Sequence, residues 1–131
     1  MLSPRVKWLM DRLEESQVIT VEKPWGVEHM ITTDEFILKV IRINPGERTS
    51  MQFHERKEEV IVPLVTGHTP KLGRGGVYKA PTGGRGLELI EGTARITPNQ
   101  IHRSVGPALL LEVTTLDNDD VVRMADDHGR A

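Results

Sequence analysis

Short apolar or alternating runs, each bounded by turn-forming residues, fill most of this chain. Such runs are typical of strands in an all-β sandwich or barrel, because successive side chains of a strand point to opposite faces. Turn signals separate them, as at Pro24, at 44–46 and at 106–107. The spacing predicts strands at 17–22, 26–32, 35–43, 49–54, 58–65, 87–91, 93–97, 100–105 and 108–115. The acid-rich segment 117–130 is expected to form one more short strand and an exposed end.

Residues 3–15 differ from this pattern and predict a helix. Ser3 is a suitable N-cap and Pro4 suits the first helical position. An apolar stripe follows at Val6, Leu9, Met10 and Leu13. The stripe could bind a partner or a second copy, but packing on the outside of the sheet is the simpler expectation.

Composition narrows the class of protein. With 131 residues the chain is long enough for a core of its own, and we expect one domain made of a helix at 3–15, a barrel at 17–124 and a tail at 125–131. A net charge of −2 indicates neither nucleic-acid nor membrane-surface binding. There is no bilayer-spanning run and no signal-peptide pattern, so we expect no membrane contact and a cytoplasmic protein. Cysteine is absent, which excludes disulfides, thiolate ligands and a cysteine nucleophile.

One stretch carries a possible metal site. Gln52 and His54 lie two apart in a predicted strand, so their side chains leave the same face. Glu59 follows beyond a charged, turn-like segment at 55–58 that could fold the chain back. An amide oxygen, an imidazole and a carboxylate on one point can hold a borderline metal ion. His102 is a fourth candidate, far downstream.

Each of these residues also has a simpler interpretation. A single histidine in a strand is more often structural or exposed than a ligand, Gln52 alone would pass as a surface residue, and Glu59 could belong to a solvated turn. The agreement of spacing and strand phase favours the metal site. The remaining histidines, His29, His68 and His128, are expected to be outward-facing or in loops.

The segment 68–86 is basic and rich in glycine, and it has no acidic residue. Its glycines are at 73, 75, 76, 83, 84 and 86, and its basic residues are His68, Lys71, Arg74, Lys79 and Arg85. The pattern matches neither a Walker phosphate loop nor a dinucleotide fingerprint. It could be a cationic lid over an anionic substrate, but a solvated hairpin loop is the expectation.

The same central stretch resembles the first motif of the cupin family. That motif is a glycine, five residues, His-x-His, a short gap, Glu and a closing glycine; here Gly46, 52–54, Glu59 and Gly67 follow the plan. Gln replaces the first His, as in the type II phosphomannose isomerase-like domain that is often fused to mannose-1-phosphate guanylyltransferase. The second motif, Pro-x-Gly-x-x-His, is approximated by 98–102. The segments 22–26, 111–113, 119–123 and 126–130 also resemble that subgroup.

This resemblance implies a double-stranded β-helix, or jelly roll, whose mouth holds one divalent metal ion. The ligands would be Gln52, His54, Glu59 and His102. Zinc is the expected metal, with manganese, iron, cobalt and nickel as alternatives. Two departures from the family pattern have structural consequences. One extra residue separates Glu59 from Gly67, which predicts a bulge near Pro63. The second motif is one residue short and the middle segment is replaced by the glycine-rich loop, so the depth of His102 in the site and the identity of the substrate stay open.

The resemblance also implies a function. We expect a metal-dependent aldose–ketose isomerase for a phosphorylated sugar, and a homodimer. The general base is not fixed by the sequence, and Lys57 and Glu91 are the candidates retained. Arg48 and Arg103 are candidates for gripping the phosphate, because guanidinium groups bind phosphate in a bidentate way. The alternatives are a non-haem cupin dioxygenase acting on a small molecule, and a non-catalytic cupin that binds a small molecule.

Overall fold

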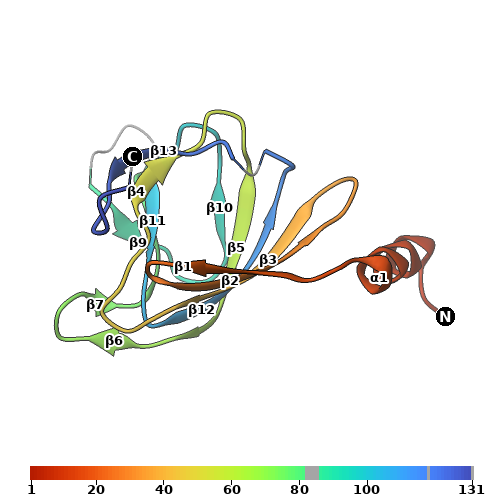
Figure 1. Cartoon of the computed structure of the whole chain (residues 1–131), viewed down its shortest axis with the longest axis horizontal. Helices are drawn as coiled ribbons and strands as arrows, with labels where there is room; N and C mark the ends of the chain where they lie inside the picture. The colour runs from red at the N-terminus through yellow and green to blue at the C-terminus, as the bar shows by residue number, and fades with distance from the viewer. Residues whose placement is uncertain (82–85, 118, 131) are drawn as a thin grey trace.

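A computed structural model describes residues 1–81, 86–117 and 119–130, and it consists mainly of two facing antiparallel sheets (Figure 1). The larger sheet has the order β1 (Ile19–Lys23), β2 (Gly26–Thr32), β3 (Ile37–Ile43), β12 (Ala108–Thr114), β5 (Glu59–Thr66), β10 (Ala94–Ile96). The smaller has the order β13 (Val122–Ala125), β4 (Met51–Phe53), β11 (His102–Val105), β8 (Gly76–Lys79), β9 (Glu88–Leu89). A two-stranded hairpin of β6 (His68–Thr69) and β7 (Gly73–Arg74) is attached. The predicted all-β jelly roll is confirmed.

The glycine-rich segment contains a strand that the sequence did not reveal. β8 pairs with β11 in the middle of the smaller sheet, and its Val77 is fully buried. The expectation of a solvated loop is therefore wrong for Gly76–Lys79, because four residues suffice for a strand when neighbours pair on both sides. Residues 82–85 of the expected loop lie outside the described residues.

The predicted bulge is confirmed beside Pro63. Between β12 and β5 the register moves from Leu109 opposite Val65 to Leu110 opposite Pro63, so that Leu64 is the extra residue. Proline has no amide hydrogen to donate to the ladder, and a bulge is one place where a sheet tolerates it. The additional residue in the first motif is thus absorbed locally.

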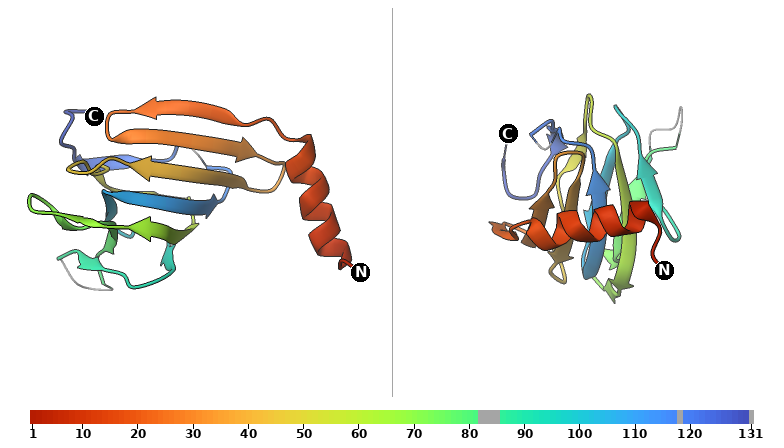
Figure 2. Two further views of the ribbon diagram at one scale, coloured as in Figure 1. Left: turned by 90° about the horizontal axis from the view of Figure 1, so that it is seen from below. Right: turned by 90° about the vertical axis from the view of Figure 1, so that its right-hand side faces the viewer.

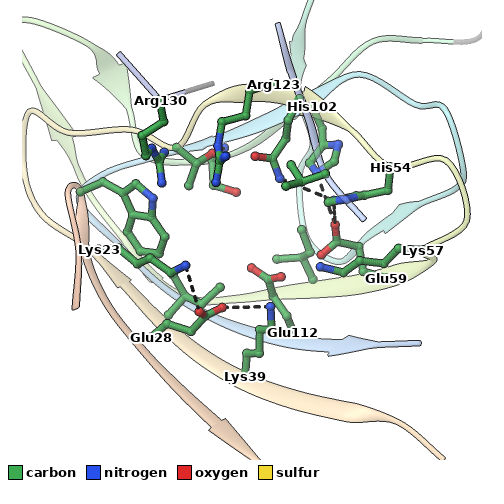
Figure 3. Close-up of a pocket in the computed structure, with 17 residues that line it drawn as sticks. Lys23, Glu28, Lys39, His54, Lys57, Glu59, His102, Glu112, Arg123 and Arg130 are labelled. Carbon is green, nitrogen blue, oxygen red and sulfur yellow. Dashed lines mark hydrogen bonds and ion pairs between the residues drawn. The ribbon is translucent and has the colours of Figure 1, made fainter. Parts of the chain in front are cut away.

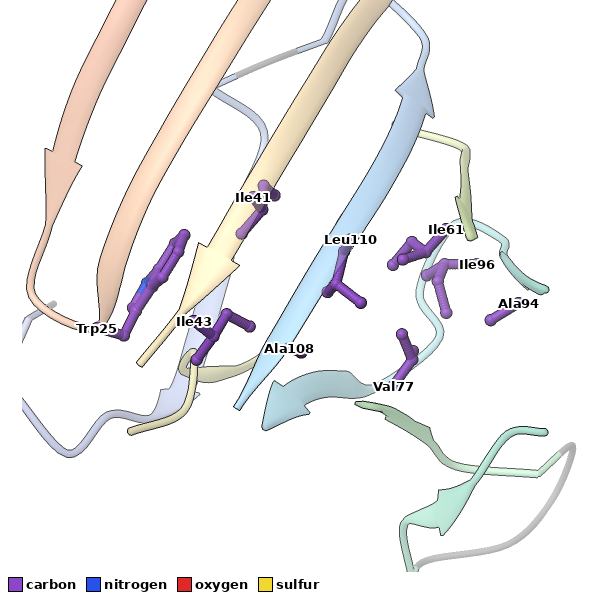
Figure 4. Close-up of a cluster of buried hydrophobic side chains, with 9 residues drawn as sticks. All are labelled: Trp25, Ile41, Ile43, Ile61, Val77, Ala94, Ile96, Ala108 and Leu110. Atoms are coloured by element: carbon purple, nitrogen blue, oxygen red, sulfur yellow. The ribbon is translucent and has the colours of Figure 1, made fainter. Parts of the chain in front are cut away.

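The core lies between the sheets, and it gives way to polar residues toward one end (Figure 4). Its buried members are Trp25, Ile41, Ile43, Ile61, Val77, Ala94, Ile96, Ala108 and Leu110. Two residues further along the inner face, each of three neighbouring strands carries a buried charged residue instead. These are Lys39 on β3, Glu112 on β12 and Glu59 on β5. The inner surface therefore changes from a packed core to a polar site within one barrel.

The N-terminal helix forms as predicted but is packed differently. α1 (Pro4–Glu15) begins after Ser3, whose Oγ accepts a hydrogen bond from the Val6 amide at 3.3 Å. None of its residues is buried, and it projects from one end of the larger sheet (Figure 2). It borders a groove lined mainly by apolar side chains, including Trp8 of the helix and Phe36 beside the sheet. No helix in the described part of the chain is long and apolar enough to cross a bilayer.

Candidate metal centre and its cavity

Two histidines and a glutamate meet inside the barrel mouth (Figure 3). His54 directly follows β4, His102 begins β11 and Glu59 begins β5. Pairing of β4 with β11 sets Gln52 opposite His102, which brings the two cupin motifs side by side. The Nε2 atoms of His54 and His102 lie 2.9 and 3.3 Å from the same oxygen, Oε1 of Glu59. Each of the three residues is no more than 4% exposed.

Backbone carbonyls fix the tautomer of both imidazoles. Nδ1 of His54 lies 2.5 Å from the carbonyl oxygen of Asp120, and Nδ1 of His102 lies 2.9 Å from that of Gln100. A carbonyl oxygen only accepts, so each Nδ1 must carry the hydrogen. In the neutral rings the Nε2 lone pairs then point at Glu59. This is how the outer contacts of a metal-binding histidine orient its ligand atom.

Glu59 faces the cluster as a carboxylate. Burial by itself would raise the pKa of Glu59, but the contacts with His102 and His54 and the charge of Lys57 hold that pKa well below its usual range. A cation at this point would be bound by the Nε2 atoms of both imidazoles and by the Glu59 carboxylate. The three ligand atoms lie within 4.8 Å of one another, so the cluster can hold a metal ion.

Gln52 is placed to complete the ligand set. Its Nε2 lies 3.5 Å from Nε2 of His54, and its Oε1 accepts a hydrogen bond from the hydroxyl of buried Ser50 at 2.5 Å. A serine hydroxyl can either donate or accept. The Gln52 amide can therefore turn its oxygen toward the cluster and keep its contact with Ser50.

The turn after His54 is held from outside the cluster. The Asp120 carboxylate accepts hydrogen bonds from the backbone amides of Arg56 at 2.6 Å and Lys57 at 2.9 Å, and the Arg56 bond is the main reason that the pKa of Asp120 is lowered. Asn99, at the glycine position of the second motif, has a φ of 66° and donates its amide to the His54 carbonyl at 2.6 Å. Asparagine adopts this left-handed conformation more readily than most residues, so the motif works without its glycine.

The cluster forms one wall of a cavity of about 150 Å³. Among the described residues, basic side chains outnumber acidic ones along its walls: Lys23, Lys39, Lys57, Arg123 and Arg130 against Glu28, Glu59 and Glu112. The buried Lys39–Glu28 ion pair, 3.0 Å long, and the Lys23–Glu28 pair, 3.7 Å long, lie on the wall away from the cluster. The guanidinium groups of Arg123 and Arg130 point into the cavity (Figure 3).

Glu112 is a buried acid that the sequence did not single out. It lies opposite Lys39 across the β3–β12 ladder and hydrogen-bonds to Glu59. Burial, followed by the charge of Glu59, raises the pKa of Glu112 well above its usual range. The raised pKa favours the protonated form of Glu112 beside the Glu59 carboxylate. The sequence could have indicated this position, because Glu112 is two residues from Leu110 and therefore lies on the same face of the strand.

Of the four residues predicted for catalysis and phosphate binding, the cavity includes Lys57. Arg103 lies between His102 and Ser104, which line the cavity, so strand alternation puts it on the opposite face of the smaller sheet. Arg48 is ion-paired there with Asp127 at 2.7 Å. Glu91 is exposed, and it forms a 2.8 Å ion pair with Arg74 on the surface. The structure does not bring these three residues to the cluster.

Three of the basic residues that line the cavity belong to segments near the ends of the chain. Lys23 lies in the predicted N-terminal signature of the phosphomannose isomerase-like group, and Arg123 and Arg130 lie in its C-terminal one. These segments were part of the sequence resemblance, so they could have indicated which basic residues line the cavity. Arg103 was chosen because it is next to His102 in the sequence, but neighbouring residues of a strand point to opposite faces.

Comparison with known proteins agrees with this geometry. A cupin-2 domain protein from Rhodospirillum rubrum superposes with a TM-score of 0.58 at 11% identity, over 82% of this chain and 74% of that one. The chain has the cupin fold. Oxalate decarboxylase from Bacillus subtilis matches with a TM-score of 0.58 at 13% identity, over 85% of this cupin and 30% of that chain. A structure of CapF with an inhibitor reaches 0.62 at 14% identity, over 83% and 34% of the two chains.

The sequence resemblance is confirmed by a curated relative of this chain. Mannose-1-phosphate guanylyltransferase of Escherichia coli (strain K12) is 33% identical over 121 residues, which cover 84% of this chain and 23% of the relative. The cupin thus spans about a quarter of the length of that protein. No family model matches the chain.

Proposed function

We propose that this cupin is a metal-dependent aldose–ketose isomerase for a phosphorylated sugar, similar to mannose-6-phosphate isomerase. The observation that carries the proposal is one cavity with two complementary halves: the His54–Glu59–His102 cluster, and an excess of lysine and arginine. The resemblance to the phosphomannose isomerase-like domain points to the same substrate class, and so does the partial match to a mannose-1-phosphate enzyme.

The donor set suits one divalent ion. Gln52, His54, Glu59 and His102 would hold it, and we propose zinc, with manganese, iron, cobalt and nickel also compatible with nitrogen and oxygen ligands. A bound ion would supply Lewis-acid polarisation of the adjacent carbonyl and hydroxyl oxygens of the open-chain sugar. The two backbone carbonyls that accept from Nδ1 keep both imidazoles in the ligating tautomer.

The phosphate would bind to the cavity cations. Arg123 and Arg130 present guanidinium groups, which match phosphate oxygens in a bidentate way, and Lys23 lies nearby on the same cavity wall. In Figure 3 these three lie on the side of the cavity away from His54 and Glu59. A bound sugar phosphate would therefore extend from the cations to the cluster, which sets its reacting end at the metal ligands.

The proton that moves between adjacent sugar carbons needs a carrier within the cavity. Lys57 and Glu112 both line the cavity beside Glu59, and Lys57 is 4% exposed. The Glu112 carboxyl group points inward and has a raised pKa, and the Lys57 side chain ends in the same cavity. We propose these two side chains as the acid–base pair of the isomerisation.

A second candidate function rests on the ligand set. Two histidines and one carboxylate are also the ligands of non-haem iron oxygenases, so this cluster could serve a small-molecule dioxygenase. The excess of lysine and arginine along the cavity favours a phosphorylated ligand instead. A non-catalytic role in binding the same ligand would leave the phosphate contacts intact and show no turnover.

A homodimer is proposed from the surfaces that the barrel leaves uncovered. On α1, Val6, Leu9 and Met10 are between 37% and 53% exposed. A 12-residue helix is marginal by itself, so it gains most of its stability by packing an apolar stripe. The outer face of the larger sheet exposes Leu64 and Val113. A second copy would supply the missing partner for both surfaces, and the molar mass in solution, measured by light scattering, tests this.

The proposed activity is tested with purified protein that has been stripped of metal and reconstituted with zinc. Conversion of mannose 6-phosphate to fructose 6-phosphate, followed by NMR, is the expected result. His102→Ala should lose the activity, while His29→Ala should retain it, because His29 contacts Thr20 on the outer strands. Substrate-dependent oxygen uptake with iron and no isomerisation would select the oxygenase.

A further inference from the structure

Arg48 and Arg103 form a pair of like charges on the outer side of the cavity wall. The Arg103 side chain is 9% exposed, its Nε donates to the Thr49 carbonyl at 3.1 Å, and its Nη2 has no hydrogen-bond partner among the described residues. Burial, and then the charge of Arg48, lowers the pKa of Arg103. Such a pair needs anions beside it, and Asp126 and Asp127 supply them.

Both aspartates belong to the segment that follows β13. The Asp127 carboxylate accepts two hydrogen bonds from Arg48, from Nε at 2.7 Å and Nη2 at 3.0 Å. One residue further on, His128 Nε2 lies 3.0 Å from Oε2 of Glu47. We call these four residues, Glu47, Arg48, Asp127 and His128, the clasp. It joins the loop before β4 to the C-terminal segment.

Arg130 is fixed by the residue next to the clasp. Its backbone amide, Nε and Nη2 all donate to the Asp126 carboxylate, at 2.7, 2.9 and 3.0 Å. Gly129 has a φ of 69° and turns the chain back between them. Residues 126–130 thus form a compact turn, and one side of it is anchored to Arg48 while the other presents Arg130 to the cavity.

Besides the clasp, the described residues connect this turn to the barrel through β13. β13 is an edge strand that pairs with β4 alone, and its register shifts between Arg123 and Ala125. Three of its four residues are exposed. Edge pairing this short opens more readily than the central strands do. The place of Arg130 over the cavity therefore depends on the clasp.

We propose that the clasp positions Arg130 for binding the anionic group of the ligand, so that Arg48 and Asp127 act on binding through the chain and not by contact. The proposal takes one element from the proposed function, namely that the ligand carries an anionic group. It also gives Arg48 and Arg103 a role that their place outside the cavity allows: they anchor the segment whose last arginine reaches inside.

The test uses the full chain and the variants Asp127→Asn and Arg48→Gln. The ion pair is about one-third exposed on each side, and pairs of this kind contribute modestly, so we expect amide exchange in residues 122–130 to accelerate by about fivefold. The Kd for mannose 6-phosphate should rise by about the same factor, and zinc content should not change. The charge-swapped variant, Arg48→Asp with Asp127→Arg, should recover part of both effects.

Arg74→Ala is the matched control, because it breaks an arginine–glutamate pair of similar geometry on the surface, away from the cavity. It should leave exchange in 122–130 and the Kd unchanged. Unchanged exchange in Asp127→Asn would overturn the clasp, and so would faster exchange with an unchanged Kd. If the wild-type protein binds no mannose 6-phosphate while exchange still accelerates in the variant, the anionic ligand of the proposed function is wrong and the clasp is a structural anchor only.

Discussion

His54 turns Nε2 toward Glu59: this atom lies 2.9 Å from the carboxylate oxygen, while Nδ1–H is donated to the Asp120 carbonyl. His102 approaches the same oxygen at 3.3 Å, with its own Nδ1–H donated to Gln100. With its hydrogen on Nδ1, each ring leaves Nε2 available as a ligand for a cation that the Glu59 carboxylate would share. Because the donors are two imidazoles and a carboxylate, a divalent ion of the zinc type fits them.

Metal binding should stabilise the fold. Zinc added to chelator-treated protein should raise the melting temperature, and at a free concentration of 100 times Kd the gain is about 2.7 kcal/mol. His54→Ala should show little of this shift because it removes a ligand, whereas His29→Ala should show all of it. An equal shift in both variants, measured by differential scanning calorimetry, would place the ion elsewhere.

Arg130→Met should weaken binding of the phosphorylated sugar and leave the chemistry largely intact. A lost charge-assisted hydrogen bond typically costs 1.5–3 kcal/mol, so KM should rise roughly 10- to 100-fold with a small change in kcat. Arg95→Met, which breaks a surface ion pair with Glu58, is the control. Should Arg130→Met weaken binding of unphosphorylated mannose to the same extent, Arg130 does not contact the phosphate.

Lys57→Met and Glu112→Gln should have the opposite profile. If these side chains carry the proton, kcat should fall by about 10²- to 10⁴-fold with little change in KM or zinc content. Glutamine has the shape of a protonated carboxyl group and can still hydrogen-bond to Glu59, so Glu112→Gln should fold normally. Glu58→Gln, at the half-buried neighbour that is ion-paired with Arg95, should keep full activity. Full kcat in both Lys57→Met and Glu112→Gln would exclude them as the acid–base pair.

Acid should release the C-terminal turn. The Arg130 contact lowers the pKa of Asp126, and the Arg48 contact lowers that of Asp127. A carboxyl group with a lowered pKa stabilises the folded state above its ordinary pKa of about 3.9 and loses that contribution as the pH falls below it. Amide exchange, corrected for its intrinsic pH dependence, should therefore accelerate in 122–130 below about pH 4. Simultaneous loss of protection in 122–130 and in the strands of the larger sheet would contradict a locally held turn.

Core and outward positions of β12 should respond differently to truncation. Leu110 is fully buried, and Leu110→Ala should lower the free energy of unfolding by about 2–5 kcal/mol. Leu109 is half-buried on the outer face, so Leu109→Ala should cost clearly less. Chemical denaturation of the two zinc-loaded variants provides the comparison. Equal losses would mean that the outer face is covered in solution, as a dimer through this sheet requires.

Much of the fold was predictable because its signals are local. Side chains alternate with a period of two along a strand, and turn residues mark where strands end, so the positions of most strands along the chain could be predicted from the sequence. The first motif was found in the same way, because Gln52 and His54 share a strand face. His102 needed the resemblance to the cupin family, since the pairing of β11 with β4 joins residues 50 apart in the chain.

The less predictable parts depend on which strand face turns inward. On β12 the apolar residues Leu109, Leu111 and Val113 face outward, while Glu112 faces the cavity. The alternation of side chains along a strand does not by itself show which of the two faces turns inward. Arg103, a predicted phosphate ligand, lies outside the cavity for the same reason, because it is one residue from His102 and therefore on the other side of the sheet. β8 was missed because the glycines at 73, 75 and 76 are typical of a loop, although Val77 directly after them is buried.

The most direct test of the metal site is the metal content of the purified, zinc-reconstituted protein, measured by elemental analysis alongside His102→Ala. The geometry of His54, Glu59 and His102 predicts one tightly held ion per chain in the wild type and little in the variant. A wild-type protein that retains no ion, or a His102→Ala variant that retains as much as the wild type, would contradict the proposed metal centre and the function built on it.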